Sequence, residues 1–186
     1  MKPFHLVFIC TGNRFRSPLA ERIFRERAGL PEVTVESLGT LDLGSASALP
    51  EAVAEAQRLG IDLSDHQARS LVDADLSGAD LVLGFERMHV MTAVVEARSR
   101  RDRTFTLPEL VALLERLPRD ESKPSPERAR DRVAQAAALR APNSQLLDIP
   151  ELTDPLGRSQ EEQLRIANDV DELVYRLSHS LFGTAT

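Results

Sequence analysis

Short apolar runs alternate along the chain with longer segments that have the pattern of helices. Runs rich in Val, Ile, Leu and Phe, of which residues 4–9 are the first, are typical of buried strands. Longer stretches of mixed apolar and polar residues between them predict helices. We expect strands at residues 4–9, 33–37, 80–84 and about 103–105, and helices at 18–28, 50–59, 86–99, 108–116, 127–139 and 159–181.

This alternation predicts an α/β fold, a three-layer α/β/α sandwich with a central four-stranded parallel sheet. In such folds, sites form at the carboxyl ends of the strands. Residues 117–150 interrupt the alternation, because Pro-containing stretches flank the helix expected at 127–139. Two interpretations of this segment stay open: it covers the site, or it is a mobile, solvated excursion.

Length and composition indicate one soluble domain spanning residues 1–186. The chain is 42% hydrophobic, and it contains no apolar run near the roughly 18 residues that cross a bilayer. Residues 1–3 lead directly into the first strand, so we expect no secretory signal. One cysteine excludes an internal disulfide and fits a reducing cytoplasm. The net charge of −6 argues against general nucleic-acid affinity, so we expect a cytoplasmic protein that binds neither nucleic acid nor a membrane.

The single cysteine, Cys10, follows the first expected strand and precedes the first expected helix. Ser17 and Pro18 are typical of a helix start, with Ser as the cap and Pro at the first helical position. A loop between a strand and a helix directs backbone N–H groups and the positive end of the helix dipole toward one place. This environment stabilises an anion, including the thiolate form of a cysteine. A packing role, common for free cysteine, is the alternative.

The other loop residues fit chemistry on a phosphate group. Five residues separate Cys10 from Arg16, enough to curl around a tetrahedral oxyanion, and the planar guanidinium can bind two of its oxygens. Gly12 lets the backbone turn inward, Asn13 tolerates a positive φ, and Ser17 can donate a hydrogen bond to the cysteine sulfur. The nucleotide-binding pattern G-x-x-x-x-G-K-[ST] is absent from the sequence. We therefore expect a C-x5-R loop that acts on phosphate and does not grip a nucleotide.

These loop residues resemble those of the low-molecular-weight protein tyrosine phosphatase family. The family's loop reads C-x-G-N-x-C-R-S-P, so residues 10–18 match it except at Phe15, where the family usually has a second cysteine. The resemblance covers most of residues 3–183 and is weakest at about 117–150. Further similarities occur in chain order at residues 37–40 (S-L-G-T), 60–69 (G-I-D-L-S-D-H-Q-A-R), 79–83 (A-D-L-V-L) and the pair Asp154-Pro155.

The resemblance implies a hydrolase that forms a phosphocysteine and uses no metal or other cofactor. Cys10 would attack phosphorus while Arg16 and the loop amides hold the phosphate oxygens. A thiolate cannot protonate the leaving atom, so a carboxylic acid must approach the loop from elsewhere. Asp154, in the rigid Asp-Pro turn before the last helix, is similar to the acid of the family.

Two further residues are implied to support the loop. In the family, the residues that match Ser37 and His66 hydrogen-bond with the loop asparagine, here Asn13, and keep the loop ready for phosphate. A strand-end turn and a helix cap are the respective alternatives. The expected site residues are Cys10, Arg16 and Asp154 for catalysis, Thr11, Gly12, Asn13, Arg14, Phe15, Ser17 and Leu156 for phosphate and substrate binding, and Ser37 and His66 for support of the loop.

The substrate preference depends on Thr11, Arg14 and Leu156. Family members that act on phosphotyrosine commonly have an aliphatic residue at the position of Thr11, whereas Thr11 resembles the bacterial phosphoarginine phosphatases. Leu156 matches neither subgroup, since both usually have an aromatic residue there, and Arg14 at the loop rim could attract an acidic substrate. We expect a protein-tyrosine-phosphatase, with a protein phosphoarginine phosphatase of the same mechanism as the alternative.

Two other functions are less well supported by the sequence. Thiol-linked arsenate reductases of this fold need further cysteines, and this chain has only Cys10. A non-catalytic phosphate-binding regulatory protein is expected to lack Cys10, Arg16 or the acid, and all three are present. With Phe15 in place of the second cysteine, an oxidised Cys10 has no resolving partner nearby. We expect a phosphorylated protein as the partner, and a monomer or a weak homodimer.

Overall fold

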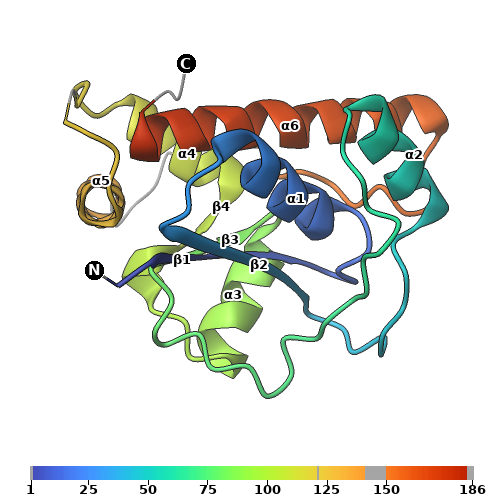
Figure 1. Ribbon diagram of the computed structural model, residues 1–186. Coiled ribbons are helices and arrows are strands. Elements are labelled where there is room, and N and C mark those ends of the chain that lie inside the picture. Colours follow the sequence, from blue (N-terminus) through green and yellow to red (C-terminus); the bar gives the residue numbers. More distant parts are fainter. Residues whose placement is uncertain (1, 121, 141–149, 184–186) are drawn as a thin grey trace.

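Four parallel strands form the central sheet in the computed structural model of the protein, which describes residues 2–120, 122–140 and 150–183 (Figure 1). The strands are β1 (Phe4–Cys10), β2 (Val33–Gly39), β3 (Leu81–Gly84) and β4 (Thr104–Thr106), in the order β2-β1-β3-β4. Cys10, the last residue of β1, pairs with Gly39 at the end of β2, and the preceding Ile9 pairs with Gly84 at the end of β3. The carboxyl ends of three strands therefore meet beside Cys10.

Helices cover both faces of the sheet, which confirms the predicted three-layer α/β/α sandwich. The helices are α1 (Arg16–Ala28), α2 (Pro50–Arg58), α3 (Arg87–Glu96), the 3-10 turn η1 (Arg101–Arg103), α4 (Leu107–Glu115), α5 (Pro126–Leu139) and α6 (Gln160–Phe182). Figure 1 shows α1, α4 and α6 on one face and α3 on the other. Within the described residues, no helix combines the length and the apolar character that a membrane span requires.

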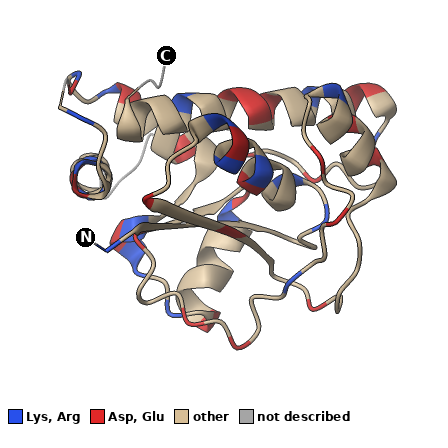
Figure 2. Ribbon diagram, in the orientation of Figure 1, with Lys and Arg blue, Asp and Glu red and all other residues tan. Residues whose placement is uncertain are grey.

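The side chains of β1 alternate between two apolar cores, one on each face of the sheet. Leu6 and Phe8 belong to the larger core, which includes residues of α1, α4 and α6, whereas Val7 and Ile9 belong to the smaller core, which includes Ala93 of α3. Burial on both faces explains why β1 reads as a continuous apolar run. Figure 2 shows that positively and negatively charged residues are interspersed along α1 and α6.

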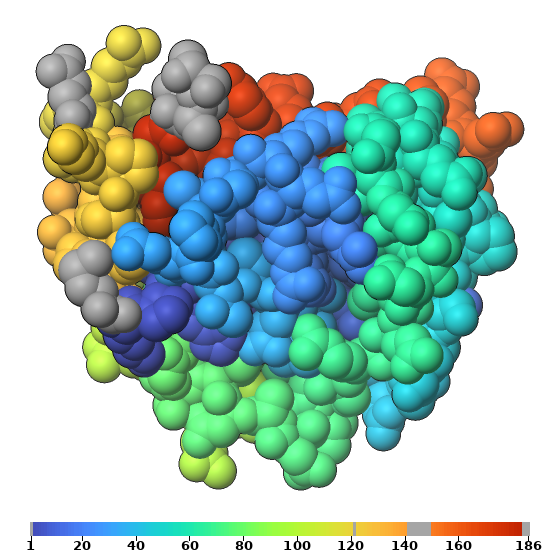
Figure 3. Space-filling view, viewed as in Figure 1, coloured from blue at the N-terminus to red at the C-terminus, as the bar shows by residue number. Residues whose placement is uncertain are grey.

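Helix α5 lies at the amino ends of β1 and β3, at the opposite edge of the sheet from Cys10. Figures 1 and 3 show it beside the N-terminal residues. Arg130 of α5 donates hydrogen bonds to both carboxylate oxygens of Asp80, at 2.9 and 3.2 Å, and α5 buries six of its residues. The described part of the 117–150 segment therefore neither covers Cys10 nor extends freely into solvent. Residues 141–149, which belong to the same segment, lie outside the described residues.

Helix α6 is anchored near its C-terminal end by Phe182. The Phe182 ring packs edge-on against Phe4 of β1 and Phe24 of α1, with ring centroids 5.6 and 6.2 Å apart. At the other end, Ser159 caps the helix and forms a capping box with Glu162. Helix α6, which follows the segment that contains Asp154, is thus fixed at both of its ends.

Replacing Phe182 with Ala should lower the free energy of unfolding by about 3–5 kcal/mol, because it opens a cavity between β1, α1 and α6. Tyr175→Ala in the same helix is the matched control: Tyr175 is 58% exposed. For this control we expect a change within about 0.5 kcal/mol. Urea denaturation followed by circular dichroism measures both values. Equal losses in the two variants would contradict the anchoring role of Phe182.

Candidate active site

The loop after β1 places the Cys10 sulfur at the start of α1. Cys10 is buried, and its Sγ lies 3.0 Å from Oγ of Ser17 in the first turn of α1. Ser17 Oγ accepts a hydrogen bond from Asn13 Nδ2 at 2.9 Å, and its own hydrogen can be donated either to the sulfur or to the more distant Leu38 carbonyl, at 3.4 Å. The N–H groups in the first turn of a helix have no acceptor within the helix. The sulfur therefore lies at the positive end of the α1 dipole.

Asn13 connects the loop to two distant segments of the chain. Its backbone is left-handed, with φ +52°, and its side chain is fully buried. Nδ2 donates to Ser37 Oγ at 2.8 Å, and Oδ1 accepts from the backbone N–H of Arg69 at 2.8 Å. His66 Nε2 donates to the Asn13 carbonyl at 2.7 Å, and burial lowers the pKa of His66, which favours its neutral form. The structure thus brings Ser37 and His66 into contact with Asn13.

The loop also approaches the end of β2 closely, at Gly39. A Cβ atom at Gly39 would lie 3.0 Å from the Asn13 nitrogen, 3.0 Å from the Gly12 carbonyl carbon and 3.1 Å from the Thr11 oxygen. All three neighbours are backbone atoms, which cannot swing away as a flexible side chain can. Gly39 is therefore required for the loop to reach its position, and the sequence analysis did not single it out.

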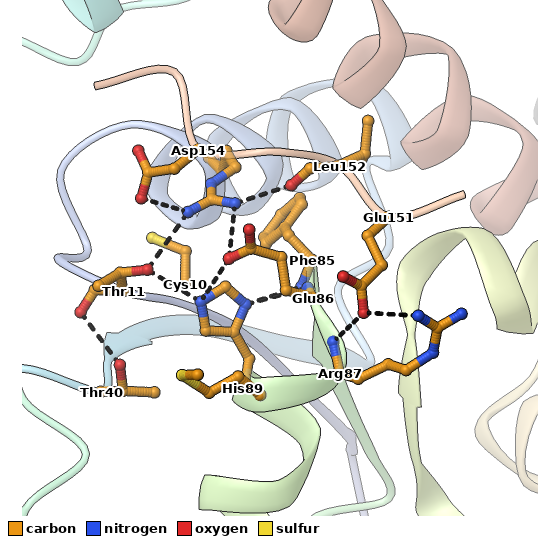
Figure 4. Close-up of polar contacts among 12 residues, drawn as sticks. Cys10, Thr11, Thr40, Phe85, Glu86, Arg87, His89, Glu151, Leu152 and Asp154 are labelled. Atoms are coloured by element: carbon orange, nitrogen blue, oxygen red, sulfur yellow. Dashed lines mark hydrogen bonds and ion pairs between the residues drawn. The ribbon is translucent and has the colours of Figure 1, made fainter. Parts of the chain in front are cut away.

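Arg16 carries the buried positive charge of the site. The residue is 1% exposed. Its Nη1 donates to the Leu152 carbonyl at 2.7 Å and lies 3.2 Å from Glu86 Oε2. Its Nη2 donates to Asp154 Oδ2 at 2.7 Å and to Thr11 Oγ1 at 3.3 Å (Figure 4). Two carboxylates therefore share one guanidinium, whose burial would be costly without such partners.

Asp154 reaches the loop from the segment that precedes α6. Leu152 N donates to the Phe85 carbonyl at 3.1 Å, which fixes this segment beside the end of β3. Asp154 Oδ1 accepts from Leu156 N at 2.9 Å, while Oδ2 accepts from Arg16. The Asp154 side chain is 41% exposed, against 2% for that of Arg16. Asp154 is therefore the solvent-accessible partner of the buried cation.

A hollow of about 110 Å³ opens at the Cys10 sulfur, with Thr11 and Asp154 among its walls. Its other lining side chains include four leucines, Leu41, Leu43, Leu49 and Leu156. Two loop residues have additional contacts away from the hollow. Phe15 is buried in the larger core, and Arg14 donates its Nε–H to the Ser47 carbonyl at 2.7 Å. Apart from Phe15, the large apolar residues that line the hollow are thus aliphatic.

Two polar residues that were not predicted from the sequence, Glu86 and His89, follow β3. Glu86 contacts Arg16, and Nε2 of the buried His89 lies 3.0 Å from Thr11 Oγ1 (Figure 4). Burial, followed by the nearby charge of Arg16, lowers the pKa of His89 to about 4. Their position directly after the strand expected at 80–84 could have indicated that they lie near the loop, because the carboxyl ends of parallel strands share one edge of the sheet.

Comparison with known families agrees with this arrangement. The family model described as low molecular weight phosphotyrosine protein phosphatase matches residues 5–124. The chain belongs to this family. It is a hydrolase of the protein phosphatase class, as the resemblance of the loop predicted. The matched region contains the loop, Ser37 and His66, and it ends before Asp154.

Individual relatives fall into two named groups. The chain is 37% identical over 109 residues to the protein-arginine-phosphatase of Bacillus subtilis, covering 57% of this chain and 71% of that protein. It is 34% identical over 99 residues to the low molecular weight protein-tyrosine-phosphatase Etp of Escherichia coli, covering 53% and 66%.

Solved structures of both groups share the fold. A mutant of YwlE from Bacillus subtilis, a protein that other solved structures name an arginine phosphatase, superposes with a TM-score of 0.69 at 26% identity, covering 96% of this chain and 98% of that one. A low molecular weight protein tyrosine phosphatase from T. tengcongensis superposes with a TM-score of 0.66 at 29% identity, covering 94% and 97%. The fold therefore does not distinguish the two groups.

Gly39→Ala should reduce kcat/KM on p-nitrophenyl phosphate by roughly a hundredfold, because the added methyl displaces the loop backbone from its phosphate-binding geometry. Gly78→Ala is the matched control, since a Cβ at Gly78 meets nothing within 4 Å. Steady-state kinetics and thermal unfolding of both variants measure the effect. Wild-type kcat/KM in a folded Gly39→Ala variant would show that the loop does not depend on this close approach.

Proposed function

We propose that the protein hydrolyses phosphotyrosine in phosphorylated proteins through a phosphocysteine at Cys10. The observation that carries the proposal is that the Cys10 sulfur, the Arg16 guanidinium and the Asp154 carboxylate line one hollow. They supply a nucleophile, an oxyanion binder and an acid, which together suffice to hydrolyse a phosphate ester. Membership of the phosphatase family supports the same chemistry.

In the first step, Cys10 Sγ attacks phosphorus opposite the leaving oxygen, so that the S–P bond forms as the P–O bond breaks. The phosphate oxygens bind the loop N–H groups and replace the Asp154 carboxylate on Nη2 of Arg16. Asp154, released from this ion pair, takes a proton from solvent and gives it to the leaving tyrosine oxygen. The exposure of Asp154 makes this exchange of partners possible.

In the second step, water attacks the phosphocysteine. The Asp154 carboxylate takes a proton from the water, the new O–P bond forms and the S–P bond breaks, releasing phosphate. The departing Cys10 thiolate accepts a hydrogen bond from the Ser17 hydroxyl, which Asn13 holds in place. The positive charge that these steps need comes from Arg16 and the backbone N–H groups.

The remaining residues of the loop and its surroundings support these steps. In this proposal, phosphate is held by the backbone of four loop residues, Gly12, Asn13, Arg14 and Phe15. Ser37 and His66 maintain the shape of the loop through their hydrogen bonds with Asn13. Leu156 forms the outer wall of the hollow. Cys10 has no second cysteine to protect it from oxidation. A reducing compartment, the cytoplasm, therefore suits the proposed function.

Phosphoarginine is the second candidate substrate, and Thr11 is the observation that favours it. The Thr11 hydroxyl lies in the hollow beside Cys10, where a polar group can contact a polar leaving group. Relatives named protein-arginine-phosphatase occur among the chain's matches. The aliphatic Leu156, which is 70% exposed, gives neither leaving group an aromatic surface to stack on.

Turnover of matched phosphotyrosine and phosphoarginine peptides by one preparation tests the substrate class. We expect a higher kcat/KM for phosphotyrosine, by roughly tenfold or more, and we expect a metal chelator to leave it unchanged. A higher kcat/KM for phosphoarginine would replace the leading proposal with the second one. Absence of turnover on either peptide and on p-nitrophenyl phosphate would reject a phosphatase altogether.

Asp154→Asn tests the acid. The variant should lose roughly a hundredfold or more in kcat on phosphotyrosine, a poor leaving group, and much less on p-nitrophenyl phosphate, whose leaving group scarcely needs a proton. Asp65→Asn is a control, because Asp65 is an exposed carboxylate that pairs with Arg22, outside the hollow. Equal losses by Asp154→Asn on both substrates would assign Asp154 a structural role.

A further inference from the structure

Glu151, which precedes Asp154 by three residues, binds the N-terminus of α3. Its Oε1 accepts a hydrogen bond from the backbone N–H of Arg87, the first residue of α3, at 2.7 Å (Figure 4). The same oxygen lies 3.3 Å from Nη1 of the Arg87 side chain. The N–H groups in the first turn of a helix have no acceptor within the helix, and the helix dipole favours a negative charge there. Glu151 therefore supplies, from a distant segment, an acceptor that α3 itself lacks.

Of these two contacts, the hydrogen bond to the helix N–H contributes more. Both side chains of the ion pair are partly exposed, 44% for Arg87 and 31% for Glu151, and ion pairs at the surface contribute little to stability. A hydrogen bond from a backbone N–H to a carboxylate is charge-assisted and stronger. The contact therefore depends first on a side chain long enough to bring an oxygen to the Arg87 N–H.

The residues between Glu151 and Asp154 continue along the same edge of the sheet. Leu152 N donates to the Phe85 carbonyl at 3.1 Å, and the Leu152 carbonyl accepts from Arg16 Nη1 at 2.7 Å. Asp154 then reaches Nη2 of Arg16. The acid segment, residues 151–154, is therefore held by β3 and α3 at one end and by Arg16 at the other.

The contact of Glu151 with α3 is independent of the exchange that the proposed reaction requires. Phosphate takes the place of Asp154 on Nη2 of Arg16, so Asp154 gives up its ion pair when it must reach the leaving oxygen. Glu151 contacts α3 and does not line the hollow. Its hydrogen bond persists while phosphate is bound, and it keeps the acid segment beside the hollow after the ion pair is broken.

We propose that Glu151 is a positioning residue for the acid: by binding the N-terminus of α3, it keeps Asp154 at the leaving oxygen after phosphate has displaced Asp154 from Arg16. The inference rests on the proposed function and deepens it. Proton transfer requires the acid within hydrogen-bond reach of the leaving atom. A less well-placed acid segment should therefore slow the departure of a poor leaving group far more than that of a good one.

Three substitutions of Glu151 separate the length of its side chain from its charge. Glu151→Ala removes the acceptor, and Glu151→Asp keeps the charge but withdraws the carboxylate by one methylene. Glu151→Gln loses the charge but can still bring an oxygen to the Arg87 N–H. The measured quantity is kcat/KM, which covers the steps up to departure of the leaving group, on a phosphotyrosine peptide and on p-nitrophenyl phosphate. Glu161→Ala is the control, because Glu161 is an exposed carboxylate in the first turn of another helix, α6.

We expect Glu151→Ala to lower kcat/KM on the phosphotyrosine peptide by roughly tenfold, and on p-nitrophenyl phosphate by less than about twofold, because that leaving group scarcely needs a proton. Glu151→Asp should lose roughly threefold on the peptide alone, whereas Glu151→Gln and Glu161→Ala should stay near the wild-type values. Inhibition by inorganic phosphate should be unchanged in all of them, since the loop is intact.

A double variant tests whether Glu151 acts through the acid. In an Asp154→Asn background, Glu151→Ala should cause no further loss on the phosphotyrosine peptide. Thermal unfolding tests the folding of each variant, and if Glu151→Ala does not fold, Glu151→Asp takes its place in both comparisons.

Four results would overturn the inference: equal losses on the two substrates, wild-type kcat/KM in both Glu151→Ala and Glu151→Asp, a loss in Glu151→Gln as large as in Glu151→Ala, or a further loss in the Asp154→Asn background. Each of them leaves a working phosphatase. Failure of the proposed function is distinct, since it requires that the wild-type protein hydrolyse neither phosphorylated peptides nor p-nitrophenyl phosphate.

Discussion

The burial of one positive charge, the Arg16 guanidinium, is the constraint on which the site depends. A buried cation is stable only with close partners, and the protein supplies a carbonyl from Leu152, a carboxylate from Glu86 and a second carboxylate from Asp154. These partners come from two segments, Glu86 after β3 and Leu152 and Asp154 before α6, so placing Arg16 also fixes the end of β3 and the segment before α6. The two carboxylates differ in exposure, with 41% of the Asp154 side chain exposed against 27% of that of Glu86. In the proposed mechanism phosphate replaces Asp154, so that substrate binding and release of the acid are one event.

The shape of the loop depends on neutral hydrogen bonds made by Asn13. Its side chain and carbonyl bind groups from β2 and from the segment that contains His66 and Arg69. These bonds hold a left-handed residue that few side chains tolerate, and Gly39 leaves the space for it. The loop is therefore held in its shape by its surroundings, so the proposed function requires little reorganisation when a phosphate group arrives.

The sequence predicted the sandwich and the loop because both have local signals. The continuous apolar run of β1 and the spacing from Cys10 to Arg16 are visible without knowledge of any neighbour. Glu86 and His89 were missed, and Gly39 was noted only as part of the stretch 37–40, because all three contact the loop across the sheet order β2-β1-β3. The alternation of strands and helices does not specify this order. The position of α5 was missed for a similar reason, since its anchor, Arg130 on Asp80, joins residues far apart in the sequence. The family resemblance predicted Asp154 as the acid, whereas its ion pair with Arg16 could be seen only in the three-dimensional structure.

The central claim is that Cys10 carries the phosphoryl group during turnover. The most direct measurement mixes the protein with excess phosphotyrosine peptide, stops the reaction with denaturant within the first turnover, and locates bound phosphate by peptide mass spectrometry. The account predicts phosphate on the Cys10 peptide, at no more than one group per chain, formed before free phosphate accumulates and absent from Cys10→Ser. Steady release of phosphate without label on Cys10, or turnover by Cys10→Ser, would contradict it.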